Sequence, residues 1–236
     1  MSNRIILELP DNSEVLINSV DFIDINGENN IVKIKYESVE KFKAIKGLKI
    51  SIHGKNNKVN LGKIIYPGGA NMTLPGLSLC IGLPVDDTLI PGTPRDANNC
   101  EVNIGDNTII CGAMLLLINN DTSINIGNDC MISWGVDIWC TDAHTVTDLE
   151  GNPLNFAKSV EIGNHVWIGR DVKIGKNTKV SDDSIIGWNS VVTKKFNQSN
   201  IIIAGNPAQI VKQDINWNFR DLYNYQLFRE SQKIPQ

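Results

Sequence analysis

An apolar residue followed by a small one recurs every six residues through much of this 236-residue chain. A fixed short period is typical of a solenoid, in which each unit buries its apolar side only by stacking on its neighbours. One branched side chain per hexad would point inward, and the small residue after it would let the backbone turn a corner. Three hexads make a coil of 18 residues, with coils stacked about 4.8 Å apart. The steps are Ile162-Gly163, Ile168-Gly169, Ile174-Gly175, Val180-Ser181, Ile186-Gly187 and Val192-Thr193.

The same register continues upstream, and one long segment interrupts it. From Ile138 to Ile162 the separation is 24 residues, or four hexads, yet residues 142–158 contain no hexad. Gly151, Pro153 and many polar residues there predict a loop that leaves the coil. Long loops on rigid scaffolds often carry function. The upstream steps are Ile104-Gly105, Ile110-Cys111 and Leu116-Leu117, then, after a four-residue insertion, Ile126-Gly127, Ile132-Ser133 and Ile138-Trp139.

The first hundred residues repeat less regularly. Residues 23–30 are echoed 27 positions later by residues 50–57, and Val32 matches Val59. Each copy alternates like a strand and ends in a Gly/Asn corner. We therefore expect residues 1–100 to be an irregular start of the same solenoid, with 67–99 as long Gly- and Pro-rich excursions.

Residues 101–212 form the expected hexad domain, and the chain changes character after it. Over 213–236 we expect a short amphipathic helix that closes the open end of the last coil. The residues at helical spacing are Phe219, Leu222, Tyr223, Gln226 and Leu227.

Composition argues against several classes of protein. A charged fraction of 20% and a net charge of −4 give no reason to expect a nucleic acid or an anionic membrane as partner. No apolar stretch approaches the roughly 20 residues of a membrane span, and the first apolar run is too short for a signal peptide. Five cysteines without paired metal spacing are interpreted as reduced packing residues. We expect a cytoplasmic protein.

The three histidines differ in their surroundings. His53 and His165 fall at predicted corners, which favours polar turn residues. His144 opens the predicted loop, two residues after Asp142. It is either a solvated loop residue or a general base, because histidine titrates near neutrality and a nearby carboxylate could orient its ring. A zinc site would need three converging imidazoles, which this spacing does not favour, so we predict no metal.

Two tryptophans are expected to face outward from the coils. Trp167 leads into the side that carries Ile168, and Trp188 follows Ile186 one coil later. On one face they would form an apolar wall with N–H donors, suited to a ligand or to a partner subunit.

Together, these features resemble the hexapeptide-repeat acyltransferases, which transfer acyl groups from coenzyme A. The similarity covers residues 100–217 well and the N-terminal third weakly, and within the family it is greatest to surface-polysaccharide and sialic-acid O-acetyltransferases. It implies an all-β fold, a left-handed parallel β-helix with an extruded loop and a short C-terminal helix. The motifs are Asp142-Ala143-His144, residues 162–169 (IGNHVWIG), residues 190–194 (SVVTK), residues 204–208 (AGNPA) and residues 214–217 (DINW).

The resemblance also implies a site. His144 would be the catalytic base, with Asp142 beside it, and Trp167 would supply an oxyanion donor through its indole or a nearby backbone N–H. Acetyl-CoA would be the co-substrate and a carbohydrate the acceptor, bound between subunits of a homotrimer. The implied coenzyme contacts are Arg170, Trp188, Thr193, Lys194, Gln209 and Lys212, with close backbone approach at Gly187, Ala204 and Gly205.

Three functions stay open at this point. The first is O-acetylation of a sugar in a bacterial surface polysaccharide. The second is N-acetylation of an amino-sugar nucleotide, or acetylation of a small xenobiotic, by the same base. The third is a catalytically silent solenoid that serves as a scaffold.

Overall fold

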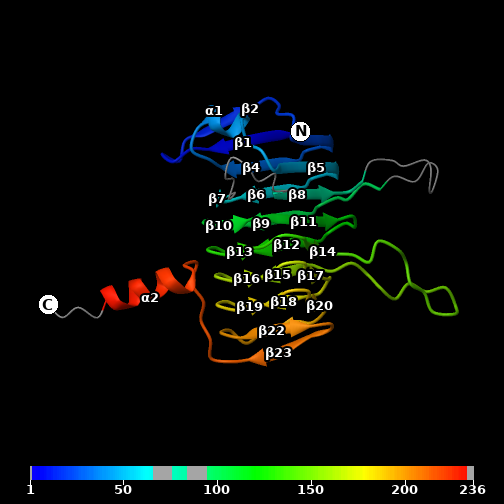
Figure 1. The fold of residues 1–236 in the computed structure, drawn as a ribbon. Helices are drawn as coiled ribbons and strands as arrows, with labels where there is room; N and C mark the ends of the chain where they lie inside the picture. Colours follow the sequence, from blue (N-terminus) through cyan, green and yellow to red (C-terminus); the bar gives the residue numbers. More distant parts are fainter. Residues whose placement is uncertain (1, 66–75, 84–94, 233–236) are drawn as a thin grey trace.

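The computed structural model describes residues 2–65, 76–83 and 95–232, which stack as coils of three short strands (Figure 1). The strands form three sheets that run the length of a prism: in the described part sheet A has nine strands, and sheets B and C have seven each. In each regular coil the chain passes from sheet A to sheet C and then to sheet B, through corners that we call A–C, C–B and B–A. The predicted left-handed parallel β-helix is confirmed.

The strand bounds follow this three-sided path. Sheet A contains, in spatial order, β2 (Glu14–Ile17), β1 (Arg4–Glu8), β4 (Ile31–Lys35), β6 (Lys58–Leu61), β9 (Glu101–Ile104), β12 (Ser123–Ile126), β15 (Val160–Ile162), β18 (Lys179–Val180) and β21 (Lys195–Phe196). Sheet C contains β7 (Ile64–Ile65), β10 (Thr108–Ile110), β13 (Met131–Ile132), β16 (Trp167–Ile168), β19 (Ile185–Ile186), β22 (Ile202–Gly205) and β23 (Ala208–Lys212). Sheet B contains β3 (Ile23–Glu28), β5 (Leu48–Lys55), β8 (Gly76–Ile81), β11 (Gly112–Leu117), β14 (Val136–Trp139), β17 (Lys173–Ile174) and β20 (Val191–Val192).

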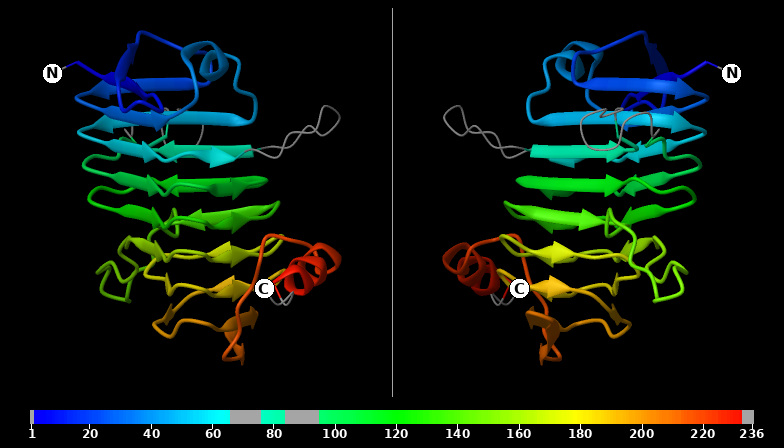
Figure 2. Two further views of the ribbon diagram at one scale, coloured as in Figure 1. Left: turned by 90° about the vertical axis from the view of Figure 1, so that its left-hand side faces the viewer. Right: turned by 90° about the vertical axis from the view of Figure 1, so that its right-hand side faces the viewer.

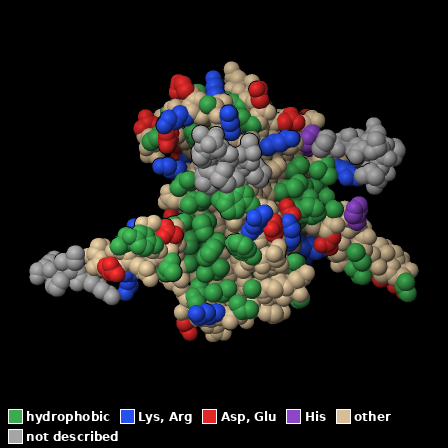
Figure 3. Space-filling view, in the orientation of Figure 1, with side chains coloured by type: hydrophobic (Ala, Val, Ile, Leu, Met, Phe, Trp, Pro, Cys, Tyr) green, Lys and Arg blue, Asp and Glu red, His purple; other side chains and the backbone are tan. Residues whose placement is uncertain are grey.

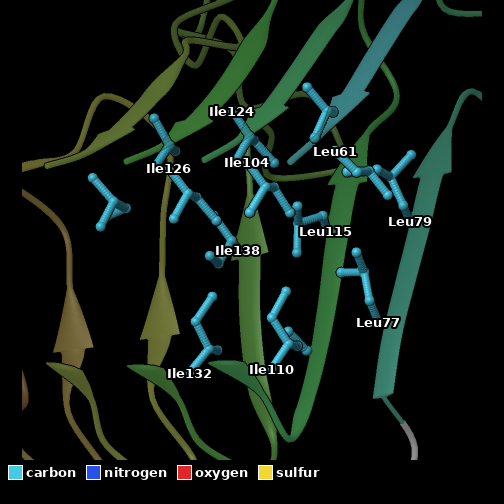
Figure 4. Packing of buried hydrophobic residues seen from close by; sticks show 14 of the residues in the cluster. Leu61, Leu77, Leu79, Ile104, Ile110, Leu115, Ile124, Ile126, Ile132 and Ile138 are labelled. Carbon is cyan, nitrogen blue, oxygen red and sulfur yellow. The ribbon is translucent and has the colours of Figure 1, made fainter. Parts of the chain in front are cut away.

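The apolar residues of the hexads fill the prism. All six inward residues of the ladder from Ile162 to Val192 are at most 4% exposed. The first three stack on the residue 18 positions later, as Ile168 does on Ile186. The last coil is shorter, since Val180 pairs with Phe196 and Ile186 with Ile203. Figure 4 shows the same stacking in the coils above, where Ile104 and Ile126 follow one another into the core. Full burial of one such side chain is worth roughly 1.5–3 kcal/mol, so stacking provides the stability of the fold.

One predicted step of the ladder is wrong by one residue. Ile138 pairs with Leu115, and Trp139 pairs with Leu116. The inward residue of that coil is therefore Leu115, and Leu116 belongs to the outer side of β11. The C–B corner of this coil is one residue shorter than the next, because Ile110 precedes Ala113 by three residues whereas the matching Ile132 precedes Val136 by four.

The N-terminal repeat is confirmed, but the predicted excursions are only partly so. Strands β3 and β5 pair in register from Ile23 with Ile50 onward, and Val32 pairs with Val59. Strand β8 lies within the segment that we expected to be excursion, and its alternate residues Leu77, Leu79 and Ile81 are buried. The Gly and Pro residues on either side concealed this strand. Of the other residues in the expected excursions, 67–75 and 84–94 lie outside the described residues, and Leu83 pairs with Arg95 in an isolated bridge. A short helix, α1 (Val39–Lys43), buries Phe42 beside the first coils.

An antiparallel strand lies at each end of the solenoid, and at the N-terminal end α1 lies beside it (Figure 1). Strand β2 folds back on β1 at one end, and β23 folds back on β22 at the other. The predicted C-terminal helix exists as α2 (Leu222–Ser231), but none of its residues is buried and it projects from the side of the solenoid (Figure 2). The expectation that it closes the coil end is wrong, because the hairpin β22–β23 already continues sheet C there.

The A–C corners are built around glycine and an amide or carboxylate from the next coil. Asp182 Oδ1 accepts a hydrogen bond from the N–H of Asn164 (2.8 Å), and a Cβ added to Gly163 would lie 2.1 Å from that same oxygen. The residue after Asn164, His165, adopts a left-handed φ of 52°, as do Asn and Asp residues at other corners. Short polar side chains tolerate this conformation better than others do.

No helix in the described part of the chain is long and apolar enough to cross a membrane. No group of three or more His, Cys, Asp or Glu side chains is placed there to hold a metal ion. Four cysteines are buried and Cys80 is partly exposed, and burial raises the pKa of Cys130 to about 11.

Candidate active site

The extruded loop leaves the solenoid at the B–A corner, between β14 and β15. At its base the Thr141 hydroxyl donates to Asn119 Oδ1 (2.7 Å) and accepts from the N–H of Ala143 (3.0 Å). Ala143 has a left-handed φ of 63°, which an alanine adopts only where its surroundings enforce it. The backbone therefore turns sharply just before His144, whose N–H donates to the carbonyl of Asp142 (2.7 Å).

Asp142 fixes the backbone of the loop and does not contact the imidazole. Its carboxylate accepts hydrogen bonds from Asn155 Nδ2 (2.8 Å) and from Lys176 Nζ. Asn155 Nδ2 also donates to the carbonyl of His144 (2.8 Å), and Lys176 donates to the carbonyl of Asn155 (2.7 Å). The Lys176 ammonium and the Asn155 amide lower the pKa of Asp142. Between these two described residues no hydrogen bond joins the carboxylate to the ring of His144, so Asp142 orders the backbone of the loop and not the imidazole.

His144 lines a hollow at the base of the loop. The hollow has a volume of about 330 Å³ and also includes Asn119, Thr141, Asn155 and Phe156 in its walls. The His144 residue is exposed, so its ring is open to a ligand in the hollow. A wider hollow of about 530 Å³ near the N-terminal end contains none of the predicted site residues.

Trp167 lies in sheet C, whereas His144 lies in the loop at the B–A corner. Trp167 begins β16, and its backbone N–H donates to the carbonyl of Ser184 in the next coil (2.9 Å). That N–H is therefore committed to the sheet, and the indole is the donor that Trp167 itself still has to offer. The indole is half-buried, with its ring centroid 6.0 Å from that of Trp217.

Trp188 does not share a face with Trp167, contrary to expectation. It lies in the C–B corner after β19 and is 67% exposed. Its Cδ1 lies 2.7 Å from where a Cβ on Gly169 would be, so the indole covers that corner of the previous coil. Arg170 occupies the same corner and pairs with Asp171 (3.3 Å). The predicted wall of two indoles is wrong because Trp188 has already left the strand.

The remaining predicted coenzyme contacts group near the C-terminal end of the solenoid. A Cβ on Gly187 would lie 3.0 Å from the Cβ of Ala204, so the two coils approach closely there. Gly205 has a φ of 103° and donates its N–H to Ser190 Oγ (3.1 Å). Lys194 Nζ donates to Gln209 Oε1 (2.5 Å). Thr193 and Lys212 are exposed, and neither takes part in the hydrogen bonds and close approaches just described.

The two halves of the predicted site lie on opposite flanks of one chain. In Figure 1 the loop after β14 extends from one flank, whereas β16 and β19 lie on the other. The side views of Figure 2 likewise place the loop and α2 on opposite sides. A single chain therefore does not bring His144 together with Trp167 or Trp188.

Sequence reasoning missed an aromatic cluster that anchors the C-terminal segment. Trp217 is 8% exposed, stacks on His165 with centroids 4.2 Å apart and planes 9° apart, and donates its indole N–H to the carbonyl of His165 (2.7 Å). Phe219 packs edge-on against Trp217 at 4.7 Å, and His165 Nδ1 is hydrogen-bonded to Asp183 (2.9 Å). The predicted corner at His165 is confirmed, but its ring also supports this segment.

Lys176 and Asn155 were missed for different reasons. Lys176 follows Lys158 by 18 residues, so the coil period places it directly below the point where the loop returns, and this signal was available. Asn155 lies inside the loop, where no period applies, and only the structure reveals that it bonds both Asp142 and His144.

Comparison with known proteins gives consistent findings. No protein-family model matches the chain. The chain is similar to the polysialic acid O-acetyltransferase of Neisseria meningitidis, with 32% identity over 203 residues that cover 86% of this chain and 91% of that protein. It is also similar to the solved structures of the polysialic-acid-specific acetyltransferase NeuO (22% identity, covering 98% of this chain and 97% of that chain) and the polysialic acid O-acetyltransferase OatWY (21%, 97% and 98%), each with a TM-score of 0.53. At such identities these two structures speak for the fold alone.

Proposed function

Because the chain belongs to the hexapeptide-repeat acetyltransferases that include the polysialic acid O-acetyltransferases, we propose that it transfers an acetyl group from acetyl-CoA to a sugar hydroxyl of a bacterial surface polysaccharide. The observation that carries this proposal is the exposed His144 in the hollow at the base of a tightly hydrogen-bonded loop. A general base has to lie where the acceptor hydroxyl can reach it. The hydrogen bonds at the foot of the loop keep His144 in that position.

His144 acts as the base in this proposal. Its neutral imidazole takes the proton of the sugar hydroxyl as that oxygen attacks the thioester carbonyl of acetyl-CoA. The tetrahedral intermediate then expels the coenzyme thiolate as the C–S bond breaks, and the imidazolium returns the proton to the sulfur. The products are the acetyl ester and free coenzyme A, and proton transfer of this kind contributes about 10²–10⁴ in rate.

Trp167 is the proposed oxyanion donor, and it acts from a neighbouring copy of the chain. Because its own backbone N–H is bonded within sheet C, the role falls to the indole N–H. The separation of His144 and Trp167 on opposite flanks supports a homotrimer with its active sites between copies, in which the flank of one copy faces the opposite flank of the next.

The coenzyme is proposed to lie along the C–B corner and the C-terminal coils. Arg170 and Lys212 are exposed cations that suit its phosphates, and Lys194 adds a third beside Gln209. Gly187, Ala204 and Gly205 have no side chain beyond a Cβ, so their own side chains do not cover the backbone from an approaching ligand. Trp188 and Thr193 complete the proposed contacts.

The first test is the variant His144→Ala. We expect kcat for acetyl transfer to fall by about 10²–10⁴, with little change in KM for acetyl-CoA. Release of coenzyme A thiol is measured with polysialic acid, neutral polysaccharides, amino-sugar nucleotides and small alcohols as acceptors. His53→Asn is the matched control, because His53 pairs in register with Asn26 and lies outside the hollow.

Two results would contradict this proposal. Unchanged acetyl transfer in His144→Ala would show that His144 is not the general base. If acetyl-CoA is consumed only when an amino-sugar nucleotide is the acceptor, the proposed O-acetylation is wrong and N-acetylation takes its place.

A further inference from the structure

Helix α2 has an apolar surface that no described part of its own chain covers. None of its residues is buried, and Leu222, Tyr223 and Leu227 are exposed. Asp221 caps its start by accepting from the N–H of Asn224 (3.0 Å). A helix of ten residues is marginal in water on its own, so its stability has to come from packing against a partner.

The direction of α2 is set before the helix begins. The indole of Trp217 is stacked on His165 and hydrogen-bonded to its carbonyl, which pins the segment to the A–C corner of the solenoid. Only four residues separate Trp217 from Leu222. The helix therefore projects from a fixed point on the flank that carries sheet C (Figure 1).

The extruded loop has a second uncovered apolar surface. It is organised as a hairpin by its own bonds: the N–H of Leu154 donates to the carbonyl of Val146 (2.8 Å), and the N–H of Asn152 to the carboxylate of Asp148 (2.8 Å). Val146, Leu149, Leu154 and Phe156 are nevertheless exposed. Figure 3 shows apolar side chains at the surface of both projections.

The two surfaces lie on opposite flanks and at a similar level along the solenoid (Figures 1 and 2). A rotation about an axis parallel to the solenoid carries the loop of one copy to the helix of the next, and repetition of that rotation closes a ring. Cations are available to face the acidic loop tip with Asp148 and Glu150, since Arg220 lies over the ring of Phe228 and Arg229 follows it. Within the helix segment Asp221 and Glu230 balance these two charges, so the pairing rests on the apolar surfaces and their placement.

We propose that α2 of each copy docks on the extruded loop of the neighbouring copy, Leu222, Tyr223 and Leu227 packing on Val146, Leu154 and Phe156. The occupant of each surface is thus a second copy of this chain. This inference rests on the oligomer proposed above and adds its contact, by which the arm of one copy holds the His144 loop of its neighbour against its own sheet C.

Cysteine cross-linking between two kinds of subunit tests the docking. One kind carries Leu149→Cys or Leu154→Cys in the loop, and the other carries Leu222→Cys or Leu227→Cys in α2. The kinds differ in mass through a tag and are expressed together, then treated with a short bismaleimide. We expect cross-linked pairs that contain one subunit of each kind, at least tenfold above either kind alone, because a head-to-tail contact joins unlike surfaces.

The cross-linking controls test the docking contact separately from the catalytic proposal. Leu16→Cys, exposed on β2 at the far end, replaces the helix cysteine as matched control, and the native chain gives the background from Cys80. An oligomer in light scattering with no cross-link at any of the four pairings would overturn the docking and leave the oligomer intact. A monomer would overturn both. The His144→Ala assay reports on the chemistry independently.

Hydrogen exchange provides the second readout. In the docked oligomer the amides of residues 222–231 are expected to be protected, and Leu154→Ser, a change in the loop alone, should speed their exchange by roughly ten- to hundredfold. Val211→Ser, equally exposed but on β23, is the control and should leave them unchanged. Exchange of α2 that is insensitive to Leu154→Ser would refute the contact.

Discussion

The side chain of Lys176 holds the loop that carries His144, although it follows that histidine by 32 residues in the sequence. Its ammonium group bridges the Asp142 carboxylate and the Asn155 carbonyl, so it joins the two ends of the loop. Because both partners are only partly shielded from water, the pair stabilises the loop modestly. For the proposed base its importance lies in geometry, since a general base that drifts from its acceptor loses rate steeply.

Lys176→Met should loosen the loop without unfolding the solenoid. We expect the exchange protection of residues 142–158 at neutral pH to fall about two- to fivefold, and kcat to fall more than KM changes. Lys173→Met is the control, since Lys173 bonds Asp137 outside the loop.

Loop protection in the native chain should also depend on pH. The lowered pKa of Asp142 means that its contribution is present at neutral pH and is lost as the pH falls below about 4, through the lowered pKa. In Lys176→Met this loss should be weaker. A loop equally protected in both chains at every pH would show that the pair does not hold it.

At the scale of elements, the period predicts what lies inside and fails where packing between distant segments decides. The inward residues from Ile162 to Val192 follow from the hexads alone. The prediction places Leu116 inside the core wrongly, because one corner is a residue shorter than the period expects. The hydrophobic pattern does not reveal this shift, since Leu115 and Leu117 are apolar too. The contact of Trp217 with His165 joins residues 52 positions apart, and no local pattern encodes it.

The hexad glycines are not equivalent, although the sequence presents them alike. At the A–C corner, a Cβ on Gly163 would meet Asp182 Oδ1 at 2.1 Å and the backbone nitrogen of the same residue at 2.7 Å. At the B–A corner, a Cβ on Gly175 would have Val192 O at 3.7 Å, an ordinary contact. Only the first corner has a polar side chain of the next coil folded over it.

Gly163→Ala should therefore lower the free energy of unfolding by about 1–3 kcal/mol, because the corner has to open to admit the methyl group. Gly175→Ala should change it by less than about 0.5 kcal/mol. Urea denaturation of both variants measures the difference. Equal values would mean that the corner relaxes freely and that glycine serves only backbone flexibility.

For the whole molecule, the arrangement of one chain supports the proposed assembly. The solenoid places the loop with His144 on one flank and Trp167 on the other, so the complete site of the proposed enzyme has two owners. Each copy then contributes its His144 loop to one site and its Trp167 to another, and in a closed ring every such half is part of a complete site.

Complementation between two inactive variants tests this shared ownership. His144→Ala and Trp167→Ala chains, each nearly inactive alone, should regain activity when expressed together. Random mixing gives about a quarter of the native activity per site, because half of the loops carry the histidine and half of the facing sheets carry the tryptophan. Two singly inactive preparations mixed after assembly are the control. No recovery on coexpression would place both residues in one chain's site.

The antiparallel strands at the two ends have a consequence for polymerisation. Each coil of a hexad repeat ends in strand edges with unpaired backbone N–H and C=O groups. The coil of another molecule can pair with such an open edge. By reversing direction, β2 and β23 give sheets A and C a terminal strand on which a parallel coil cannot continue in the same pattern. Sheet B has no such strand at either end, since β3 and β20 pair in parallel with their neighbours. Removal of the final hairpin is therefore expected to leave the last coil open in all three sheets and to favour end-to-end polymerisation.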